Sequence, residues 1–322
     1  MRATRRQAFA LAGLAPLASP ALAQADWPSR SVRMVIPYPP GGASDIIARL
    51  LSPHVSELLG QTMVVENRPG ANGFIAAEYV AHSPPDGYTL LMGNAGPNGM
   101  GPALYGSRTP FDPINSFTSI MAVSVVPQIM AVHPAVPVRS FPEFMTYAAE
   151  MQGRMSYGSA GVGSAGHMAM ELLKSITGIQ LTHIPYRGSA PSTADLIGGV
   201  LPVNFDTAPV LLPHVQAGRV RGIAVTSLGR IADAPELQAI AETVPGFETV
   251  SWGGVLAPAG TPAPVVAKLN AALNTSMDRI ADALVRQGIQ PQRGTPAAFA
   301  DYLAGEVRKW TGVVQQMGLR PE

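Results

Sequence analysis

Residues 32–45 of this chain, VRMVIPYPPGGASD, decide its fold class. The apolar run 32–36 is typical of a short buried strand, and the proline and glycine residues after it cannot continue a strand or a helix. A helix is expected next, capped by Ser44 or Asp45 and ended by Gly60. A strand, a glycine-rich loop and a helix in this order indicate a parallel sheet covered by helices.

The same alternation continues outward from this stretch. Ser140 and Glu143 have the spacing of a capping box and mark a second start of the pattern. Strands are predicted at 63–65, 88–92, 155–157, 181–185, 203–205 and 220–226, and helices at 74–81, 168–178, 193–197, 210–216, 264–286 and 295–317. We therefore expect an α/β protein with two lobes.

Composition excludes several classes of protein. The chain has 322 residues, of which 47% are hydrophobic and 13% charged, and it contains no cysteine. Such a chain is too apolar to be disordered, and it has neither a disulfide scaffold nor a thiolate-ligated metal site. Its length is that of about two domains of 100–200 residues.

The N-terminus has the three parts of a secretory signal peptide. Arginines at positions 2, 5 and 6 precede an apolar run at 8–22, and Ala21-Leu22-Ala23 supplies a small-residue cleavage site. A membrane anchor is disfavoured because the run is short and contains Pro16 and Pro20. We expect residues 1–23 to be removed after export to the periplasm by the Sec or the twin-arginine route.

Removing this segment changes the charge balance. Without its three arginines the chain has 19 basic and 21 acidic residues, a net charge of −2. A chain with this charge has no electrostatic footprint for nucleic acid, so we expect no nucleic-acid partner. No other apolar stretch has the length of a membrane span, which predicts a soluble exported protein.

Two glycine-rich loops carry the functional signal. Residues 38–45 and 157–167 each lie between a predicted strand and a predicted helix. Such loops expose backbone N–H groups at a helix N-terminus, where the helix dipole favours an anion. Neither loop contains Lys or Arg, so a bound carboxylate would be held by backbone N–H groups, hydroxyls and water, and Arg187 is the one cation selected as a candidate. Asp206, just past a predicted strand, either accepts a hydrogen bond from a ligand amine or hydroxyl or caps a helix.

Catalytic motifs are incomplete. Residues 161–166, GVGSAG, match the dinucleotide fingerprint, but Tyr186 and Arg187 stand where an acidic residue would hold a ribose. The nucleophile elbow fails at Val162. The six histidines include no pair three or four residues apart, the spacing of a helical zinc site. We therefore expect a binding protein with no cofactor, no metal and no catalytic residue, and a secreted nucleotide-cofactor enzyme remains as the alternative.

Several stretches together resemble the Bug family, the extracytoplasmic receptors of tripartite tricarboxylate transporters. They are residues 27–28 (WP), 37–45 (PYPPGGASD), 66–73 (ENRPGANG), 86–90 (DGYTL), 157–167 (YGSAGVGSAGH), 184–188 (IPYRG) and 257–262 (APAGTP). The resemblance implies a two-lobed periplasmic binding protein of type II, the Venus flytrap fold, with two crossovers between the lobes. It places one lobe at 26–123 plus 250–322 and the other at 124–249.

The resemblance also implies a function and a site. Bug receptors close on a small carboxylate and deliver it to a large permease and a smaller membrane subunit, and we expect a monomer. A receptor that presents its closed form to a sensor kinase is the alternative within this class. The implied ligand-binding residues are Tyr38, Pro40, Gly41, Gly42, Ser44, Asn94, Ser159, Gly161, Gly163, Ser164, His167, Tyr186, Gly188 and Asp206.

The chain departs from the family pattern at three places. Arg187 replaces a more common lysine, Asn72 interrupts a glycine turn, and residues 93–96 (GNAG) replace a Ser/Thr-rich stretch. Arginine keeps the charge but changes the hydrogen-bond geometry. The low charge of both loops favours a mono- or dicarboxylate over citrate, and the identity of the ligand stays open.

Overall fold

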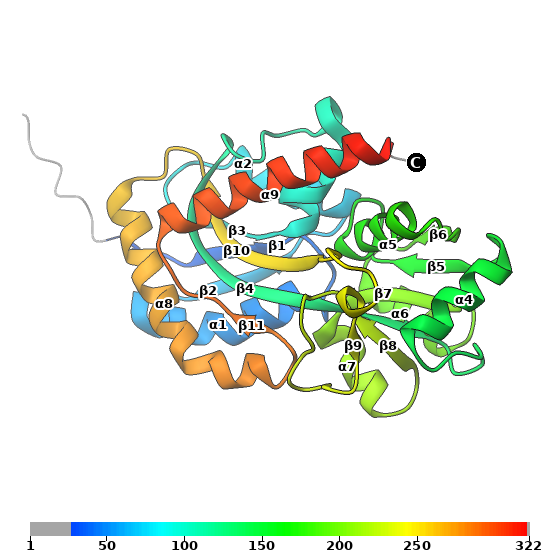
Figure 1. Ribbon diagram of the computed structural model, residues 1–322. Helices are drawn as coiled ribbons and strands as arrows, with labels where there is room; N and C mark the ends of the chain where they lie inside the picture. The colour runs from blue at the N-terminus through cyan, green and yellow to red at the C-terminus, as the bar shows by residue number, and fades with distance from the viewer. Residues whose placement is uncertain (1–26, 321–322) are drawn as a thin grey trace, which may run out of the picture.

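The structure, a computed structural model, describes residues 27–320 and consists of two lobes joined by a long strand, β4. Figure 1 shows lobe 1 on the left, formed by the two ends of the described chain, and lobe 2 on the right, formed by its middle part. The predicted signal peptide, residues 1–23, lies outside the described residues. Among the described residues, no helix is long and apolar enough to cross a membrane.

Lobe 1 is built on a mixed sheet. Its parallel part places β1 between β2 and β3, and β10 then runs antiparallel between β3 and β4, with β11 as a short addition to β4. The strands are β1 (Val32–Ile36), β2 (Met63–Asn67), β3 (Thr89–Asn94), β4 (Phe117–Val132), β10 (Val250–Pro258) and β11 (Gln290–Pro291). The parallel order carries the carboxyl ends of β1 and β3 to the same edge of the sheet, facing lobe 2.

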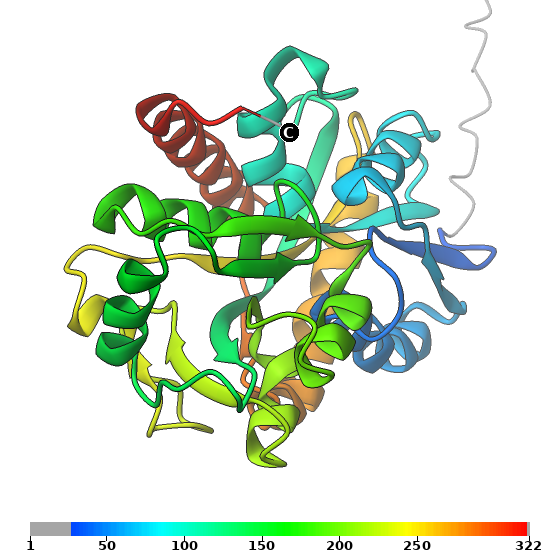
Figure 2. The ribbon, with the colours of Figure 1, turned by 90° about the vertical axis from the view of Figure 1, so that its right-hand side faces the viewer.

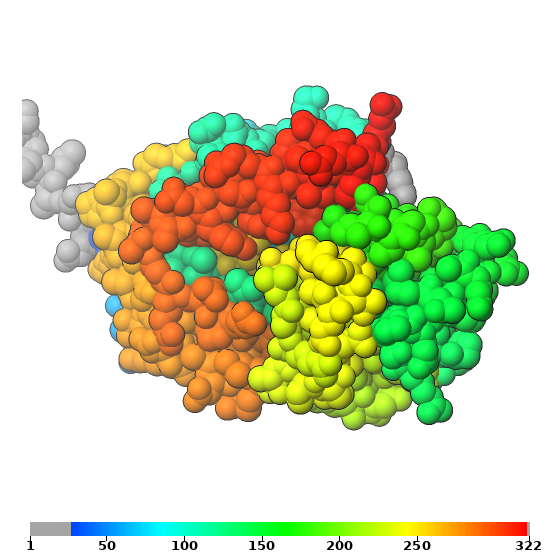
Figure 3. Space-filling view, viewed as in Figure 1, coloured from blue at the N-terminus to red at the C-terminus, as the bar shows by residue number. Residues whose placement is uncertain are grey.

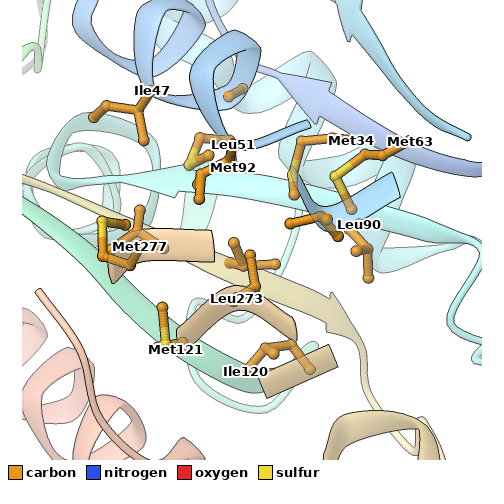
Figure 4. Packing of buried hydrophobic residues seen from close by; sticks show 14 of the residues in the cluster. Met34, Ile47, Leu51, Met63, Leu90, Met92, Ile120, Met121, Leu273 and Met277 are labelled. Atoms are coloured by element: carbon orange, nitrogen blue, oxygen red, sulfur yellow. The ribbon is translucent and has the colours of Figure 1, made fainter. Parts of the chain in front are cut away.

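Helices cover both faces of this sheet. They are α1 (Ala43–Leu59) and α8 (Ala263–Val285) on one face, and α2 (Phe74–Ala81), α3 (Gly101–Tyr105) and α9 (Pro296–Met317) on the other. The core under α1 and α8 contains several methionines, among them Met34, Met92 and Met277, interleaved with Leu and Ile side chains (Figure 4). Their flexible side chains fill the irregular space between the two helices and the sheet.

Lobe 2 repeats the arrangement. Its strands are the second half of β4, β5 (Ser156–Ser159), β6 (Thr182–Pro185), β7 (Val203–Thr207), β8 (Arg221–Val225) and β9 (Gln238–Ala239). Its helices are α4 (Phe141–Met151), α5 (Ala165–Thr177), α6 (Ser189–Ile197) and α7 (Ala208–Gln216). Figure 2, which faces this lobe, shows the strands between the helices. Two separate apolar clusters, one under α4 and α5 and one under α6 and α7, fill its two faces.

The two lobes meet at a polar hinge. Pro127 of β4 still pairs with β10, whereas the next residue, Gln128, pairs with β7 of lobe 2. Gln128 N donates to Thr226 Oγ1 at 3.0 Å, Thr226 N donates to Gln128 O at 3.0 Å, and Thr249 N donates to Thr226 O at 3.1 Å. All three side chains are completely buried. The outgoing and returning connections are therefore fastened to each other where they cross between the lobes.

Most elements follow the sequence prediction, with small differences at the ends. Thr295 caps α9 by accepting from Ala298 N at 3.2 Å, and Ser140 caps α4, as predicted. The predicted cap of α1 is wrong: Gly42 is the N-cap residue, and Ser44 and Asp45 lie in the first turn. The sequence analysis placed no strand at β4 or β10. The predicted lobe boundaries at 123/124 and 249/250 stay a prediction, close to the crossing at Gln128 and Thr249.

Candidate ligand-binding site

An inner cavity of about 60 Å³ lies between the lobes at the edge where the sheet strands end. A single water requires roughly 10–15 Å³ of such space, so the cavity has room for a few water-sized groups. Its lining comes from both lobes: Tyr38, Pro39, Pro40, Gly42, Ala43, Ser44, Asn94, Gln128, Ala160, Ser164, Ala165, Gly166, Ser189, Ala190, Phe205, Asp206, Thr207 and Ser251. Figure 3 shows the two lobes in contact on one outer face, where the green and yellow segments lie against the orange and red helices.

Four helices begin at this cavity. Residues 42–44 at the start of α1, 164–166 at the start of α5, 189–190 at the start of α6 and 207 at the start of α7 all line it. The N–H groups in the first turn of a helix have no carbonyl partner within that helix, and the helix dipole adds a partial positive charge there. None of the lining residues is Lys, Arg or His. The cavity therefore offers an anion partial charges and N–H donors in place of a cationic side chain.

An ionic network holds the first loop, between β1 and α1. The Asp45 carboxylate accepts hydrogen bonds from Gly41 N at 3.1 Å and from Arg49 Nε at 3.0 Å. Asn67 Nδ2 donates to Asp45 Oδ1 and to Tyr38 O, both at 3.0 Å. Burial alone would raise the pKa of Asp45, but these hydrogen bonds and the Arg49 charge together lower it below its usual value. The loop is thus fixed around an ionised carboxylate.

Neutral histidines hold the second loop, between β5 and α5. Gly163 N donates to His167 Nδ1 at 3.0 Å, so Nδ1 carries no proton. The His167 ring stacks on the His183 ring, with centroids 4.2 Å apart. His183 Nε2 lies 2.7 Å from Ser159 Oγ, which in turn accepts from Gly161 N at 3.1 Å. The N–H groups of Gly161 and Gly163 are therefore used in hydrogen bonds that hold the loop itself.

Burial keeps both rings neutral. Burial, aided by the charge of Lys174, lowers the pKa of His167 to about 4. Burial and then the neighbouring His167 lower the pKa of His183 to about 3, although Glu171 opposes this shift. The imidazolium form of either ring would be poorly solvated in this position.

Asn94 ties the end of β3 to two other elements at the cavity. Its Nδ2 donates to Ser44 Oγ at 3.2 Å and to Ser251 Oγ at 3.4 Å, and its Oδ1 accepts from Gly96 N at 3.2 Å. Tyr38, which also lines the cavity, is fixed by its hydroxyl, which donates to Asn72 Oδ1 at 3.1 Å. The lobe 1 side of the cavity is thus ordered by contacts within lobe 1.

A wider outer cavity of about 660 Å³ adjoins the inner one and shares Tyr38, Pro39 and Ala160 with it. Residues 69–73 and Tyr105 of lobe 1 and residues 160–162 and 185–188 of lobe 2 complete its wall. Arg187 is exposed there, and Tyr186 donates from its hydroxyl to Asp195 Oδ2 at 2.6 Å. The two cavities therefore lie side by side, with Tyr38, Pro39 and Ala160 between them.

Two glycines of lobe 2 approach lobe 1 closely. A methyl group at Gly163 (φ +77°) would lie 3.0 Å from Asn72 Nδ2 and 3.4 Å from Gly101 Cα. A methyl group at Gly188 (φ +112°) would lie 3.0 Å from the Pro39 ring. Glycine at these positions allows both the positive φ and the contact between the lobes.

The structure brings together most of the residues that the sequence analysis selected. Seven of them line the inner cavity: Tyr38, Pro40, Gly42, Ser44, Asn94, Ser164 and Asp206. Gly161, Tyr186 and Gly188 line the outer cavity. Gly41, Ser159, Gly163 and His167 line neither cavity and instead make the loop-supporting hydrogen bonds described above.

The sequence analysis missed several lining residues. Ser189 and Ala190 escaped it because α6 begins four residues before the expected start at 193. Gln128 and Ser251 escaped it because they belong to β4 and β10, which were not predicted. The polar side chains in these otherwise apolar runs were the available signal.

The sequence matches a known family model over residues 47–319, that of the tripartite tricarboxylate transporter family receptor. The chain belongs to this receptor family. BugT of Bordetella pertussis is 32% identical over 91% of this chain and 91% of its own length. The match extends from within α1 to just past the end of α9, so it includes both lobes of the receptor.

Solved structures resemble this receptor closely. The R. palustris protein Rpa4515, solved with adipate, has a TM-score of 0.88 and 37% identity, covering 92% of this chain and all of its own (100%). MatC of Rhodopseudomonas palustris, solved with bound malate, has a TM-score of 0.85 and 30% identity, covering 89% and 100%. The family and these neighbours are solute-binding receptors rather than enzymes.

Proposed function

We propose that this receptor captures a small organic carboxylate in the inner cavity and delivers it to the membrane subunits of a tripartite transporter. The observation that carries the proposal is the convergence of the N-termini of α1, α5, α6 and α7 on one cavity without a cationic side chain. Adipate and malate, with which the two relatives were solved, are both small dicarboxylates and support a ligand of this class.

The carboxylate would be held from both lobes at once. We assign direct contact to the inner-cavity residues Tyr38, Pro40, Gly42, Ser44, Asn94, Ser164 and Asp206. Gly41, Ser159, Gly163 and His167 position the loops, and Gly161, Tyr186 and Gly188 shape the entrance. A ligand that touches both lobes binds the closed form better than the open form, and this difference in affinity shifts the population toward closure.

Delivery requires export and a membrane partner. We propose that the mature chain acts in the periplasm as a monomer and presents its closed form to a large permease and a smaller membrane subunit. The family match supports this partner pair, because tripartite transporters give the receptor family its name.

A thermal-shift panel of small carboxylates tests the proposal. Ligand at about 100 times its dissociation constant stabilises the folded form by roughly 2.7 kcal/mol. For a chain of this size each kcal/mol raises the melting temperature by about 2–4 °C, so a true ligand should give a shift of several degrees. Mass spectrometry of the supernatant after denaturation identifies a ligand that copurifies.

A matched pair of variants locates the site. Ser164→Trp at the start of α5 should abolish the shift, whereas Ile176→Trp at the exposed end of the same helix should leave it unchanged. Full affinity of Ser164→Trp would remove the second loop from the site. The absence of any shift and of any copurified acid would overturn the function.

A further inference from the structure

Asp206 carries a buried acceptor oxygen that the protein leaves without a partner. The residue lies near the end of β7, is 6% exposed and lines the inner cavity. Its Oδ1 accepts from Thr207 N at 2.7 Å, whereas its Oδ2 is buried and has no hydrogen-bond partner. The Ser189 hydroxyl also interacts with this carboxylate, but it leaves Oδ2 without a partner. A buried acceptor in this state is destabilising unless a ligand supplies a donor.

The surroundings of Asp206 supply no compensating charge. Tyr38 faces it from the β1–α1 loop, and burial together with the Asp206 charge raises the pKa of that phenol above its usual range. On α5, His167 accepts from Gly163 N, and Glu171 and Lys174 form an ion pair with each other. On α6, Asp195 accepts from the Tyr186 hydroxyl. On α7, His214 lies in the last turn, far along the helix from its start beside Asp206. β4, which pairs with Asp206 through Ile129, has no ionisable side chain.

The Asp206 carboxylate therefore needs only a small further rise in its pKa to take up a proton near neutral pH. Burial raises the pKa of Asp206 to about 6, and hydrogen bonding from Ser189 and Thr207 offsets only part of this rise. Near neutral pH the group is mostly ionised. A second bare carboxylate brought against Oδ2 would add like-charge repulsion in a buried site and favour the protonated form further.

We propose that Asp206 selects ligands that present an N–H or O–H donor to Oδ2, opposite the carboxylate held by the helix N-termini. This inference rests on the proposed function of the inner cavity. Ammonium and hydroxyl groups bring their own donor. A dicarboxylate brings none, so its distal carboxylate binds only together with one proton from solution, shared with Asp206. The receptor thus prefers amino acids, hydroxy acids and singly protonated diacids to simple fatty acids.

Two series of ligands with equal chain length test this selectivity by calorimetry on the mature protein. The four-carbon series is butanoate, 4-hydroxybutanoate, 4-aminobutanoate and succinate; the six-carbon series is hexanoate, 6-hydroxyhexanoate, 6-aminohexanoate and adipate. In whichever series binds, the hydroxyl- and amine-terminated acids should bind at least tenfold more tightly than the methyl-terminated acid. Measurements in two buffers of different ionisation enthalpy should show uptake of close to one proton per diacid at pH 7.

The variant Asp206→Asn separates this role from a structural one. An amide offers both an acceptor and a donor, so the variant should bind the diacid without proton uptake and at least as tightly as the wild type. The same variant should bind the amine-terminated acid at least tenfold more weakly, because the ion pair is lost. Asp301→Asn, an exposed acid on α9, is the matched control and should change neither quantity.

The outcomes are distinct. Equal binding of methyl- and donor-terminated acids, or diacid binding without proton uptake by the wild type, overturns the role of Asp206 and leaves the proposed function standing. Failure of all eight acids to bind counts against the proposed function as well as this inference.

Discussion

The two glycine loops that face each other across the inner cavity are held by opposite kinds of chemistry. The first loop depends on an ionised carboxylate, Asp45, with Arg49 and Asn67 as its partners. The second loop depends on the neutral rings of His167 and His183, stacked in a buried position. Both arrangements direct a helix N-terminus at the same cavity, so the same anion-binding geometry is obtained with charge in one lobe and without it in the other.

The difference teaches that the loops should fail under different conditions. A carboxylate whose pKa is lowered in the folded state stabilises the fold fully at any pH above its pKa in the unfolded chain. For Asp45 that unfolded pKa is 3.8, so its contribution is lost only as the pH falls below about 3.8. A histidine with a lowered pKa stabilises the fold fully above its unfolded value of about 6.5 and progressively less as the pH falls toward the folded value. Mild acid should therefore weaken the second loop and spare the first.

The largest expected effect is this acid response. Between pH 6.5 and about 4, the unfolding free energy should fall by up to about 1.4 kcal/mol per pH unit for each of His167 and His183, because the unfolded chain binds the protons. His167→Asn should reduce this slope, since an amide oxygen still accepts from Gly163 N and does not titrate. Urea unfolding at a series of pH values measures the slope.

Two controls sharpen the test. Asp45→Asn should lower stability by a similar amount at every pH in this window and leave the slope unchanged. His82→Asn removes an exposed histidine and should also leave the slope unchanged. A slope that is insensitive to His167 would show that acid unfolding starts elsewhere.

The next effect concerns how closely each loop approaches the opposite lobe. Gly163→Ala places a methyl group 3.0 Å from Asn72 Nδ2 of lobe 1. Binding of the carboxylate found in the thermal-shift panel should weaken by about tenfold, equivalent to about 1.4 kcal/mol, because the closed form is destabilised. Isothermal titration of the variant against the wild type gives this ratio.

Gly178→Ala is the matched control for backbone strain. Gly178 also has φ +77°, but a methyl group there meets no atom within 4 Å. Both variants should lose about 1–2 kcal/mol of stability from the left-handed backbone conformation, and only Gly163→Ala should lose affinity. Gly41→Ala in the first loop (φ +93°), which also meets nothing within 4 Å, should behave like the control. Equal affinity of all three variants would refute a close approach specific to the second loop.

The smallest effect is expected from Arg187, the cation that lines the outer cavity. Because both loops offer N–H groups and helix dipoles, Arg187→Ala in the outer cavity should change the dissociation constant by less than about threefold. The association rate should fall slightly at low salt and become equal to that of the wild type at high salt. Stopped-flow binding at two salt concentrations checks this, and a tenfold loss of affinity would mean that Arg187 holds the ligand directly.

The parts of the fold with local signals could be predicted from the sequence. The helix at 74–81 was predicted with its observed ends, and Thr295 was predicted as the cap of α9, because capping residues and glycine stops act over a few residues. β4 and β10 were not predicted. Pro127 interrupts the β4 run and Gly253-Gly254 interrupts β10, and both strands are buried on both faces, so neither shows the alternation of a half-exposed strand.

The candidate site also contains parts that the sequence predicts from local patterns and parts that it does not. The two loops stand out because glycine-rich turns before helices are local patterns. The roles of Ser159 and His167 as supports depend on His183, which lies 24 and 16 residues further along the chain and reaches them only when β5 and β6 pair side by side. The contribution of Gln128 likewise follows from the crossing of the lobes. Contacts between residues so far apart in the chain leave no local pattern from which they could be predicted.

The crossing of β4 and β10 between the lobes also sets an order in time. Lobe 2 lies within the chain between two parts of lobe 1, so a polypeptide that emerges from its N-terminus contains all of lobe 2 before β10, α8 and α9 are present. The core beneath α1 takes Leu269, Leu273 and Met277 from α8 and lacks one of its layers until then. During synthesis, lobe 2 with its second loop is therefore complete early, whereas the core beneath α1, the helix that follows the first loop, is completed last.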